Sequence, residues 1–288
     1  MTEPTTHTVA APGAVLYYDV RRNDATTEPP LLLIGSPMTA AGFVTLAGHF
    51  ADRTVVTFDP RGAGRSKRTD DATESPPEEH ADDLHRLITA VAAGPVDMFA
   101  TSGGAVNALV LVASHPEQVR TLVAHEPPAA QVLPDREQVL AACSDIRETY
   151  ERSGFGPAMA KFIALVSVGG PLPADFASRP APDPASFGLP ATDDGSRDDP
   201  LVGLNMPSCV AYQHDFGALR AAPTRIVPGV SAEAGTALPG RAAVAVAERL
   251  GTAAVTFPGG HDGFLGGEFG RTGDPDAFAA TLRAVLTG

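Results

Sequence analysis

Short apolar runs alternate with helix-like segments through the first part of this chain. The runs are rich in Val, Leu and Ile, are bounded by turn residues, and lie at residues 31–35, 54–58, 96–100 and 119–125. Such runs are typical of strands that are buried on both faces. The segments between them show helical patterns, and Ser75 with Glu78 has the spacing of a helix start. Because parallel strands need long crossover connections, usually helices, the alternation predicts an α/β protein with a mostly parallel sheet and helices on both faces.

The alternation stops after Pro128 and resumes near residue 222. The stretch between has three helix-like segments separated by a region rich in Pro, Gly and Asp, so it is an insertion rather than more sheet. A chain of 288 residues is long enough to bury a large core. We therefore predict one core domain, residues 1–128 and 222–288, and a helical cap domain, residues 129–221.

Acidic residues outnumber basic ones: 34 Asp and Glu stand against 21 Lys and Arg, for a formal net charge of −13. Nucleic-acid binding needs clustered Lys and Arg, and the basic residues here are scattered singly, so we expect no nucleic-acid partner. The N-terminus lacks a basic region followed by an apolar stretch, and nowhere is an apolar run long enough to cross a membrane. We therefore expect a cytoplasmic protein with no membrane partner, and a homodimer stays open.

Cys143 and Cys209 are the only cysteines of the chain. Two cysteines are too few for a disulfide framework, and their separation does not fit a zinc site, so both are predicted to be free thiols. Among the histidines, His80 and His85 are five residues apart, which misses the i, i+4 spacing of a helical metal pair. The sequence predicts neither a metal site nor a cofactor.

Ser102 lies between the apolar run 96–100 and a helical pattern that begins at Gly104. Its neighbours fit the pattern small-x-Ser-x-small of a nucleophile elbow, in which a serine sits on a sharp turn from a strand to a helix. Small residues are needed two positions before and after the serine because neighbouring backbone crowds those places, and here Ala100 replaces the usual first glycine. A serine that only caps the helix is the competing interpretation. The strand before Ser102 and the helix after it favour the nucleophile.

A second motif, FDPRGAGRS at residues 58–66, follows the run 54–58 and matches D-x-R-G-x-G-x-S. With the elbow, it resembles the α/β-hydrolase superfamily, and the resemblance extends from Leu31 to the final helix. It implies a mostly parallel eight-stranded sheet with a helical cap insertion, and it does not identify a substrate. We interpret Asp59 and Arg61 as structural, because a turn packed beneath the nucleophile needs its backbone groups paired.

His261, in FPGGHDGFL, follows an apolar strand pattern near the C-terminus, where this superfamily carries its histidine base. The other histidines are expected in solvated or core positions, with the structural interpretation also favoured for two that lie closer to a site, His125 and His214. His261 is therefore the candidate general base.

Two glutamates compete for the acidic member of a triad. Many family members carry the acid after the later strand, but GVSAEAG lacks an Asp at the expected distance from Gly229, and Glu233 stands one position further on. A subset that includes haloalkane dehalogenases and zearalenone lactonases carries the acid after an earlier strand, and HEPP at residues 125–128 is similar to the lactonases' His-Glu-x-Pro. We favour Glu126 on this similarity. The chain order Ser, acid, His is kept with either glutamate. The alternative for Glu126 is a buried turn carboxylate that pairs with the cap.

The resemblance implies acyl transfer, with Ser102 as nucleophile, His261 as general base and Glu126 as the acid that orients it. The backbone amide of Gly103 is one predicted donor to the oxyanion. The second donor should come from GSPMT at residues 35–39, where Pro37 falls in the usual donor position and has no N–H. Either Ser36 or Met38 supplies that donor, or the oxyanion hole is defective. These residues, Ser36, Pro37, Met38 and Gly103, are the predicted substrate contacts.

A serine rather than an aspartate at the nucleophile position argues against dehalogenase and epoxide hydrolase chemistry. We therefore predict a cofactor-free serine hydrolase that acts on a small, largely apolar carboxylic ester or lactone. Five apolar residues are candidates for a pocket lining or, alternatively, for simple packing: Met38, Met159, Phe162, Met206 and Phe216. Two other functions stay open: a ligand-binding or sensing protein with little turnover, and a C–C hydrolase or cofactor-free perhydrolase with the same triad.

Overall fold

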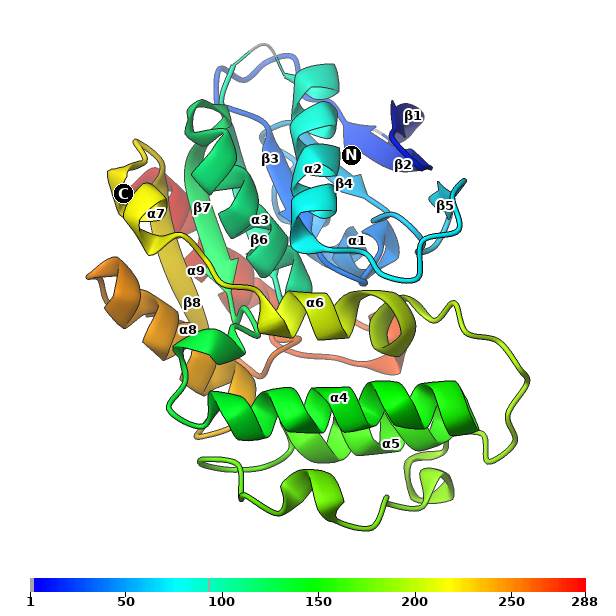
Figure 1. Ribbon diagram of the computed structural model, residues 1–288. Helices are drawn as coiled ribbons and strands as arrows, with labels where there is room; N and C mark the ends of the chain where they lie inside the picture. Colours follow the sequence, from blue (N-terminus) through cyan, green and yellow to red (C-terminus); the bar gives the residue numbers. More distant parts are fainter. Residues whose placement is uncertain (1–2, 93) are drawn as a thin grey trace.

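One sheet runs through the molecule, which is a computed structural model that describes residues 3–92 and 94–288 (Figure 1). Eight strands follow one another in the order β1-β2-β4-β3-β6-β7-β8-β9. Their bounds are β1 Thr5–Ala11, β2 Ala14–Arg21, β3 Leu31–Ile34, β4 Val55–Phe58, β6 Val96–Thr101, β7 Val119–His125, β8 Arg225–Ser231 and β9 Val255–Phe257. The short strand β5 (Lys67–Arg68) pairs with β2 beside this path.

The sheet is antiparallel at one end and parallel over the rest. β2 pairs antiparallel with β1 and with β4. Every further pair along the order, from β4–β3 to β8–β9, is parallel. The mostly parallel sheet predicted from the alternation is confirmed. Because parallel neighbours run the same way, the carboxyl ends of β3, β6, β7, β8 and β9 meet at one edge of the sheet.

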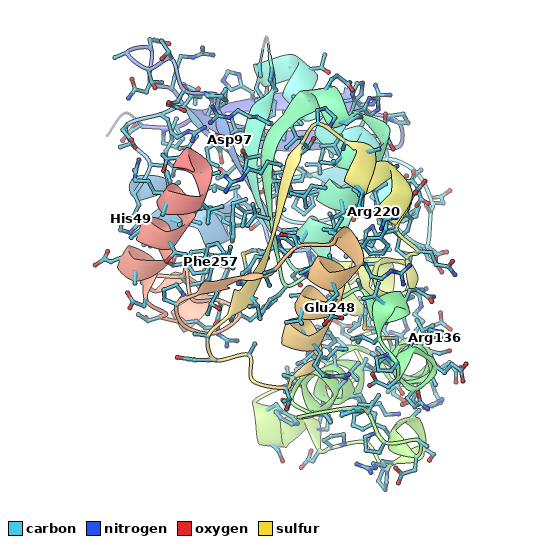
Figure 2. The ribbon with its side chains drawn as sticks, turned by 90° about the vertical axis from the view of Figure 1, so that its left-hand side faces the viewer. His49, Asp97, Arg136, Arg220, Glu248 and Phe257 are labelled. Atoms are coloured by element: carbon cyan, nitrogen blue, oxygen red, sulfur yellow. The ribbon has the colours of Figure 1, made fainter. Side chains whose placement is uncertain are left out.

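Helices cover both faces of the sheet. On one face, α2 (Pro77–Val91) and α3 (Gly103–Ser114) pack on Leu32 and Ile34 of β3; on the other face, α1 (Val44–Gly48) and α9 (Pro275–Thr287) pack on Leu31 and Leu33. All four residues of β3 are therefore buried, because successive side chains of a strand point to opposite faces. Figure 2 views the sheet from the side, with α9 on one face and Glu248 of α8 (Leu238–Leu250) on the other.

Residues 129–221, which we call the cap segment, form helices outside the sheet. Its α- and π-helices are α4 (Arg136–Ser153), α5 (Phe155–Val166), the π-helix η6 (Pro200–Asn205), α6 (Met206–Ala211) and α7 (Phe216–Ala221), and three short 3₁₀ helices lie between them or before them. α4 packs beside α5, and α6 lies between α4 and the core helix α3 (Figure 1). α7 instead packs on α3 and α8. The division of the chain into a core domain and a cap domain stays a prediction. No helix in the described residues is both long and apolar enough to cross a membrane.

Helix α2 begins later than Ser75 and Glu78 predict. Its first residue is Pro77 and its N-cap is Pro76, which has no capping side chain. The hydroxyl of Ser75 accepts a hydrogen bond from Arg68 Nη1 at 2.5 Å instead. The helix start predicted from Ser75 and Glu78 is therefore wrong by one residue: Pro76 stands at the N-cap, and the Ser75 hydroxyl is engaged by Arg68 of β5.

The turn at residues 58–66 is held by buried charged side chains. Asp59 accepts hydrogen bonds from the backbone amides of Ala40 and Arg65, both at 2.9 Å. Arg61 is fully buried and donates from two nitrogens to Asp83, at 2.7 and 2.5 Å. These contacts agree with the structural interpretation of Asp59 and Arg61, since they pair backbone and charge inside the fold.

Asp83→Asn should lower the free energy of unfolding by about 3 kcal/mol, because it leaves the buried Arg61 guanidinium with one carboxylate partner, Glu79. Urea denaturation would measure the loss. The matched control is Asp82→Asn, which removes an exposed ion pair with Arg86 and should change the free energy by no more than about 0.5 kcal/mol. Equal effects of the two variants would contradict the structural role of the buried pair.

Candidate active site

Ser102 stands on a sharp turn between β6 and α3. Its φ of 56° and ψ of −130° lie in a region that residues other than glycine seldom adopt. Backbone strain of this kind persists only where neighbouring structure holds it, and it clusters at functional sites. The amide of Ser102 donates to His125 O at 2.9 Å, which ties the turn to β7. Although Ser102 occupies the N-cap position of α3, its hydroxyl makes no capping hydrogen bond, so the capping interpretation is wrong.

Two glycines after Ser102 are required by the close passage of another backbone. A Cβ atom on Gly104 would stand 2.9 Å from the carbonyl carbon of Gly35 and from Ile34 O. A Cβ atom on Gly103 would stand 2.6 Å from Ser36 O. Real Cβ atoms essentially never approach so closely, so the segment that follows β3 packs directly on the elbow only because both residues lack side chains.

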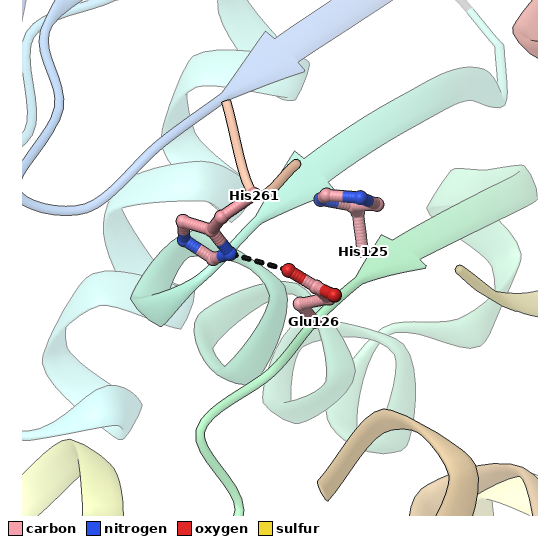
Figure 3. Close-up of side chains that lie close together, drawn as sticks. All are labelled: His125, Glu126 and His261. Carbon is pink, nitrogen blue, oxygen red and sulfur yellow. Dashed lines mark hydrogen bonds and ion pairs between the residues drawn. The ribbon is translucent and has the colours of Figure 1, made fainter. Parts of the chain in front are cut away.

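Glu126 and His261 form a hydrogen-bonded pair at the sheet edge (Figure 3). His261 Nδ1 lies 2.6 Å from Glu126 Oε2, and the other carboxylate oxygen accepts the Ser231 amide at 2.9 Å. Glu126 follows the last residue of β7 and has a φ of 47°. Its side chain is 1% exposed, whereas that of His261 is 43% exposed. The carboxylate is therefore shielded from solvent, whereas the imidazole that it contacts reaches solvent.

The carboxylate of Glu126 is stabilised in its charged form. Burial raises its pKa, but the hydrogen bond from His261, the nearby imidazoles and the Ser231 amide outweigh burial and lower the pKa to about 2. A charged carboxylate only accepts hydrogen bonds, so Nδ1 of His261 carries a proton. In the neutral imidazole Nε2 is then the lone-pair nitrogen, which is the atom a general base needs.

His125 lies beside this pair and is fully buried. Its Nδ1 is 3.1 Å from Thr101 Oγ1, its Nε2 is 3.2 Å from Ser231 Oγ, and the rings of Phe257 and Phe278 pack edge-on against it. Burial lowers its pKa to about 3, so the ring is neutral at neutral pH. These contacts agree with the structural interpretation. His125 joins the residue before the elbow serine to the residue that holds the acid.

Glu233, the other candidate acid, lies near the loop that carries His261, but its carboxylate makes no hydrogen bond to the imidazole in the part of the chain that the structure describes. Its carboxylate is exposed, and one oxygen would lie 3.4 Å from a Cβ atom on Gly260, directly before His261. Its amide donates to Gly259 O at 3.1 Å. Within the described residues no hydrogen bond joins the Glu233 carboxylate to His261, so the geometry supports Glu126.

The turn between β3 and the first helix, Gly35 to Met38, lies over the elbow. Ser36 is buried, the Ser36–Pro37 peptide is cis, and Met38 packs against Gly35 so closely that a Cβ there would stand 2.7 Å from Met38 Cβ. In the described part of the chain, the backbone amides of Gly103 and Met38 donate to no protein acceptor. The first of these amides directly follows Ser102 and the second belongs to the turn that packs on Gly103 and Gly104, so both are candidate donors to a developing oxyanion.

Ser102 itself is not hydrogen-bonded to the pair. Over residues 3–92 and 94–288, the Ser102 hydroxyl forms no hydrogen bond, with His261 or with any other side chain. The structure thus brings Glu126 and His261 into contact and leaves the third predicted member unbonded. Catalytic hydrogen bonds are often long without a bound substrate and tighten when one binds.

The family model described as the alpha/beta hydrolase fold matches residues 29–197, more than half of the chain. The chain belongs to the α/β-hydrolase family. A relative from Bacillus subtilis (strain 168), named uncharacterized hydrolase YraK, is 31% identical over 265 residues, which are 89% of this chain and 89% of that protein. The resemblance found in the sequence motifs is confirmed.

Two solved structures share this α/β-hydrolase fold. The enol-lactonase from Burkholderia xenovorans LB400 is 16% identical, with a TM-score of 0.65 over 98% of this chain and 100% of that one. A thermophilic esterase from Thermogutta terrifontis is 18% identical, with a TM-score of 0.68 over 99% of this chain and 98% of that one. At such low identity these likenesses concern the fold.

Three side chains of this hydrolase fold could also be considered as metal ligands. Atoms of His125, Glu126 and His261 all lie within 4.8 Å of one another. However, both ring nitrogens of His125 are engaged by hydroxyl groups, and Glu126 Oε2 is engaged by His261. Hydrogen bonding accounts for the cluster, and the absence of a metal site stays a prediction.

Two of the five apolar residues considered for a pocket lining are buried, Met206 and Phe216, and the other three are half-buried. Met159, Phe162 and Met206 pack in the apolar cluster of the cap segment, Phe216 lies on α7, which packs on α3 and α8, and Met38 packs against the apolar cluster that includes α1 and α9. The packing interpretation therefore accounts for them. The predicted free thiols are confirmed: Cys143 and Cys209 are both buried and unpaired, and burial raises the pKa of each to about 12.

Other residues near the elbow were not indicated by the sequence. A Cβ atom on Gly103 would stand 3.4 Å from Cys209 Sγ, so α6 of the cap segment reaches the elbow. Asn205 Oδ1 lies 3.5 Å from Ser36 Oγ. Ser231 supplies the amide that holds Glu126. Each contact joins distant parts of the chain, and no local pattern marks such a contact.

The lowered pKa of Glu126 predicts a pH-dependent contribution to stability. Its pKa is about 2 in the folded protein against 4.5 ordinarily, so the contribution is fully present above about pH 5 and is lost as pH falls toward 2. Relative to Glu126→Gln, the wild type should be more stable by about 3 kcal/mol at pH 7, and this difference should shrink steadily below pH 5. Urea denaturation at several pH values measures it.

Glu233→Gln is the matched control, because this carboxylate is exposed. Its difference from the wild type should stay small and nearly constant across the same pH range. A constant difference for Glu126→Gln would mean that the buried pair does not hold Glu126 in its charged form.

Proposed function

We propose that this α/β-hydrolase family member is a serine hydrolase that cleaves a small, largely apolar carboxylic ester or lactone through an acyl-enzyme. The observation that carries the proposal is the 2.6 Å hydrogen bond between His261 Nδ1 and Glu126 Oε2. It leaves Nε2 as the basic nitrogen on an imidazole that reaches solvent. The strained elbow at Ser102 and the unengaged amide of Gly103 add a nucleophile and an oxyanion donor.

In this mechanism Ser102 Oγ attacks the carbonyl carbon and gives its proton to His261 Nε2. Glu126 stabilises the imidazolium that forms. The amide of Gly103 donates to the oxyanion, and Met38 is the favoured second donor because its amide is also unengaged. The imidazolium then protonates the leaving alcohol as the tetrahedral intermediate collapses, and water releases the acid by the same steps in reverse order.

The relatives support this choice of reaction. A chain 31% identical to this one is named a hydrolase, and an enol-lactonase and an esterase share its fold. The enol-lactonase and the sequence HEPP at residues 125–128 favour the lactone. We assign substrate selection to the cap segment, whose helix α6 reaches the elbow at Cys209.

A second function, ligand binding or sensing with little turnover, is favoured by two observations. The Ser102 hydroxyl is not hydrogen-bonded to His261 within the described residues, and Pro37 offers no N–H to an oxyanion. The loss of one oxyanion donor lowers kcat by about 10²–10³-fold. A protein of this kind would keep the fold and bind the same small molecules.

A fluorophosphonate probe separates the two functions. In the hydrolase, the activated hydroxyl of Ser102 should be labelled within minutes, and peptide mapping by mass spectrometry should locate the adduct on Ser102. Ser102→Ala and His261→Ala should both abolish labelling, because one lacks the nucleophile and the other its base. A folded wild-type protein that resists the probe would support binding or sensing instead.

The acid is tested by Glu126→Gln and Glu233→Gln on a panel of esters, thioesters and lactones. Glu126→Gln should lower kcat by roughly 10³–10⁴-fold, because an amide can hold the imidazole in the wrong tautomer. Glu233→Gln is the control and should hydrolyse the same substrates at the wild-type rate. Loss of activity in Glu233→Gln alone would assign the acid to the later strand.

A further inference from the structure

A chain of three buried polar side chains links helix α2, the cap segment and the turn beside the elbow. His80 Nε2 lies 2.6 Å from Asn205 Oδ1, and Ser36 Oγ lies 3.5 Å from the same oxygen. All three residues are buried. The side-chain oxygen of Asn205, in the cap segment, therefore contacts His80 of helix α2 on one side and Ser36 of the turn after β3 on the other.

The direction of each hydrogen bond follows from the partners of Asn205. Its Nδ2 donates to Pro200 O at 2.6 Å, within the π-helix, which leaves Oδ1 as the acceptor. His80 must therefore donate from Nε2, and Ser36 from its hydroxyl. Burial lowers the pKa of His80 to about 4, and the charges of Arg61 and Arg68 contribute in the same direction, so the imidazole is neutral with its one proton on Nε2.

The neutral imidazole leaves an unpaired acceptor inside the protein. Nδ1 of His80 is buried and has no hydrogen-bond partner in the described residues. A buried acceptor without a partner destabilises the fold, and an apolar side chain at this place would avoid that penalty. In the part of the chain that the structure describes, the bond from Nε2 to Asn205 is the one hydrogen bond of the His80 side chain, so its value lies in what Asn205 holds.

Asn205 sits where the cap segment meets the elbow. It ends the π-helix η6, a type of helix that is frequent at functional sites, and the chain continues into α6 and Cys209. Cys209 Sγ and Ser36 O both lie near the place of a Cβ on Gly103, at 3.4 and 2.6 Å. The segment that carries Asn205 and the turn that it bonds thus approach the Gly103 amide together.

We propose that His80 and Asn205 are positioning residues for the oxyanion side of the site. Through the Ser36 hydroxyl they hold the turn from Gly35 to Met38 against Gly103, and so they set the distance between the two donors. This inference rests on the proposed function, because it concerns donors to an oxyanion. Neither residue contacts the reacting atoms; the side chains act through Ser36.

The test compares His80→Leu, which removes the donor, with His80→Gln, whose side-chain N–H can reach the place of Nε2. The readouts are the second-order rate of fluorophosphonate labelling of Ser102, and kcat and KM on an activated ester. His80→Leu should lower the labelling rate and kcat by roughly 10–100-fold with KM within about twofold, because a displaced donor weakens the transition state and not substrate binding. His80→Gln should recover to within about threefold of the wild type.

His214→Leu is the matched control. His214 is also a histidine with an unpaired buried nitrogen, and burial likewise lowers its pKa to about 4, but it packs against Tyr212 and Phe216. This variant should label at the wild-type rate. Where His80→Leu does not fold, Asn205→Leu replaces it in the comparison, and where both fold, the double variant should be no slower than either single variant.

The outcomes separate this inference from the proposed function. Rapid labelling of the wild type with equal rates for His80→Leu, Asn205→Leu and His214→Leu would overturn the positioning role alone. The positioning role would also be overturned if His80→Gln were labelled as slowly as His80→Leu, because the loss would then come from the changed shape of the side chain and not from the lost hydrogen bond. A folded wild type that is not labelled would overturn the proposed function, and this inference with it.

Discussion

Parallel pairing of the strands is the constraint on which the site depends. β6, β7 and β8 are paired so that Thr101 lies opposite His125 and His125 opposite Gly229. The three strands end at the same edge of the sheet. Ser102 follows β6, Glu126 follows β7, and Ser231, whose amide donates to Glu126, is the last residue of β8. Residues more than 100 positions apart in sequence therefore meet within hydrogen-bond distance.

The same backbone device is used twice at this edge. Ser102 and Glu126 both follow the end of a strand and both have positive φ, at 56° and 47°. A sparsely populated backbone conformation of this kind destabilises a residue other than glycine by about 1–3 kcal/mol. In each case the amide donates to the end of the next strand: Ser102 to His125 O at 2.9 Å and Glu126 to Gly229 O at 3.0 Å. The pairing of the sheet thus extends one residue beyond the strands and holds the two strained positions.

Local sequence patterns predicted the parallel sheet and its helices, whereas the details of the site depend on contacts between distant residues. The alternation of apolar runs with helices specified the parallel sheet, because periodicity and burial act within a few residues of one another. The elbow and the Glu126–His261 pair followed from motifs whose residues must stand at strand ends. The start of α2 was misplaced by one residue: Pro76 is the N-cap, and the Ser75 hydroxyl is hydrogen-bonded by Arg68 of β5, a contact that no local pattern records. His80, Asn205 and Ser231 were missed because their partners are far away in the chain, and neither spacing nor composition records such partners.

The unequal exposure of Glu126 and His261 has a consequence for proton transfer. Glu126 is 1% exposed and His261 is 43% exposed, although the atoms that join them are 2.6 Å apart. A negative charge fixed in a low dielectric acts strongly on its neighbour, because little water screens it. Because the buried carboxylate keeps a proton on Nδ1, the imidazole can take up and release a proton only at Nε2. The fixed charge thus confines every proton transfer of this ring to the nitrogen that faces away from the acid.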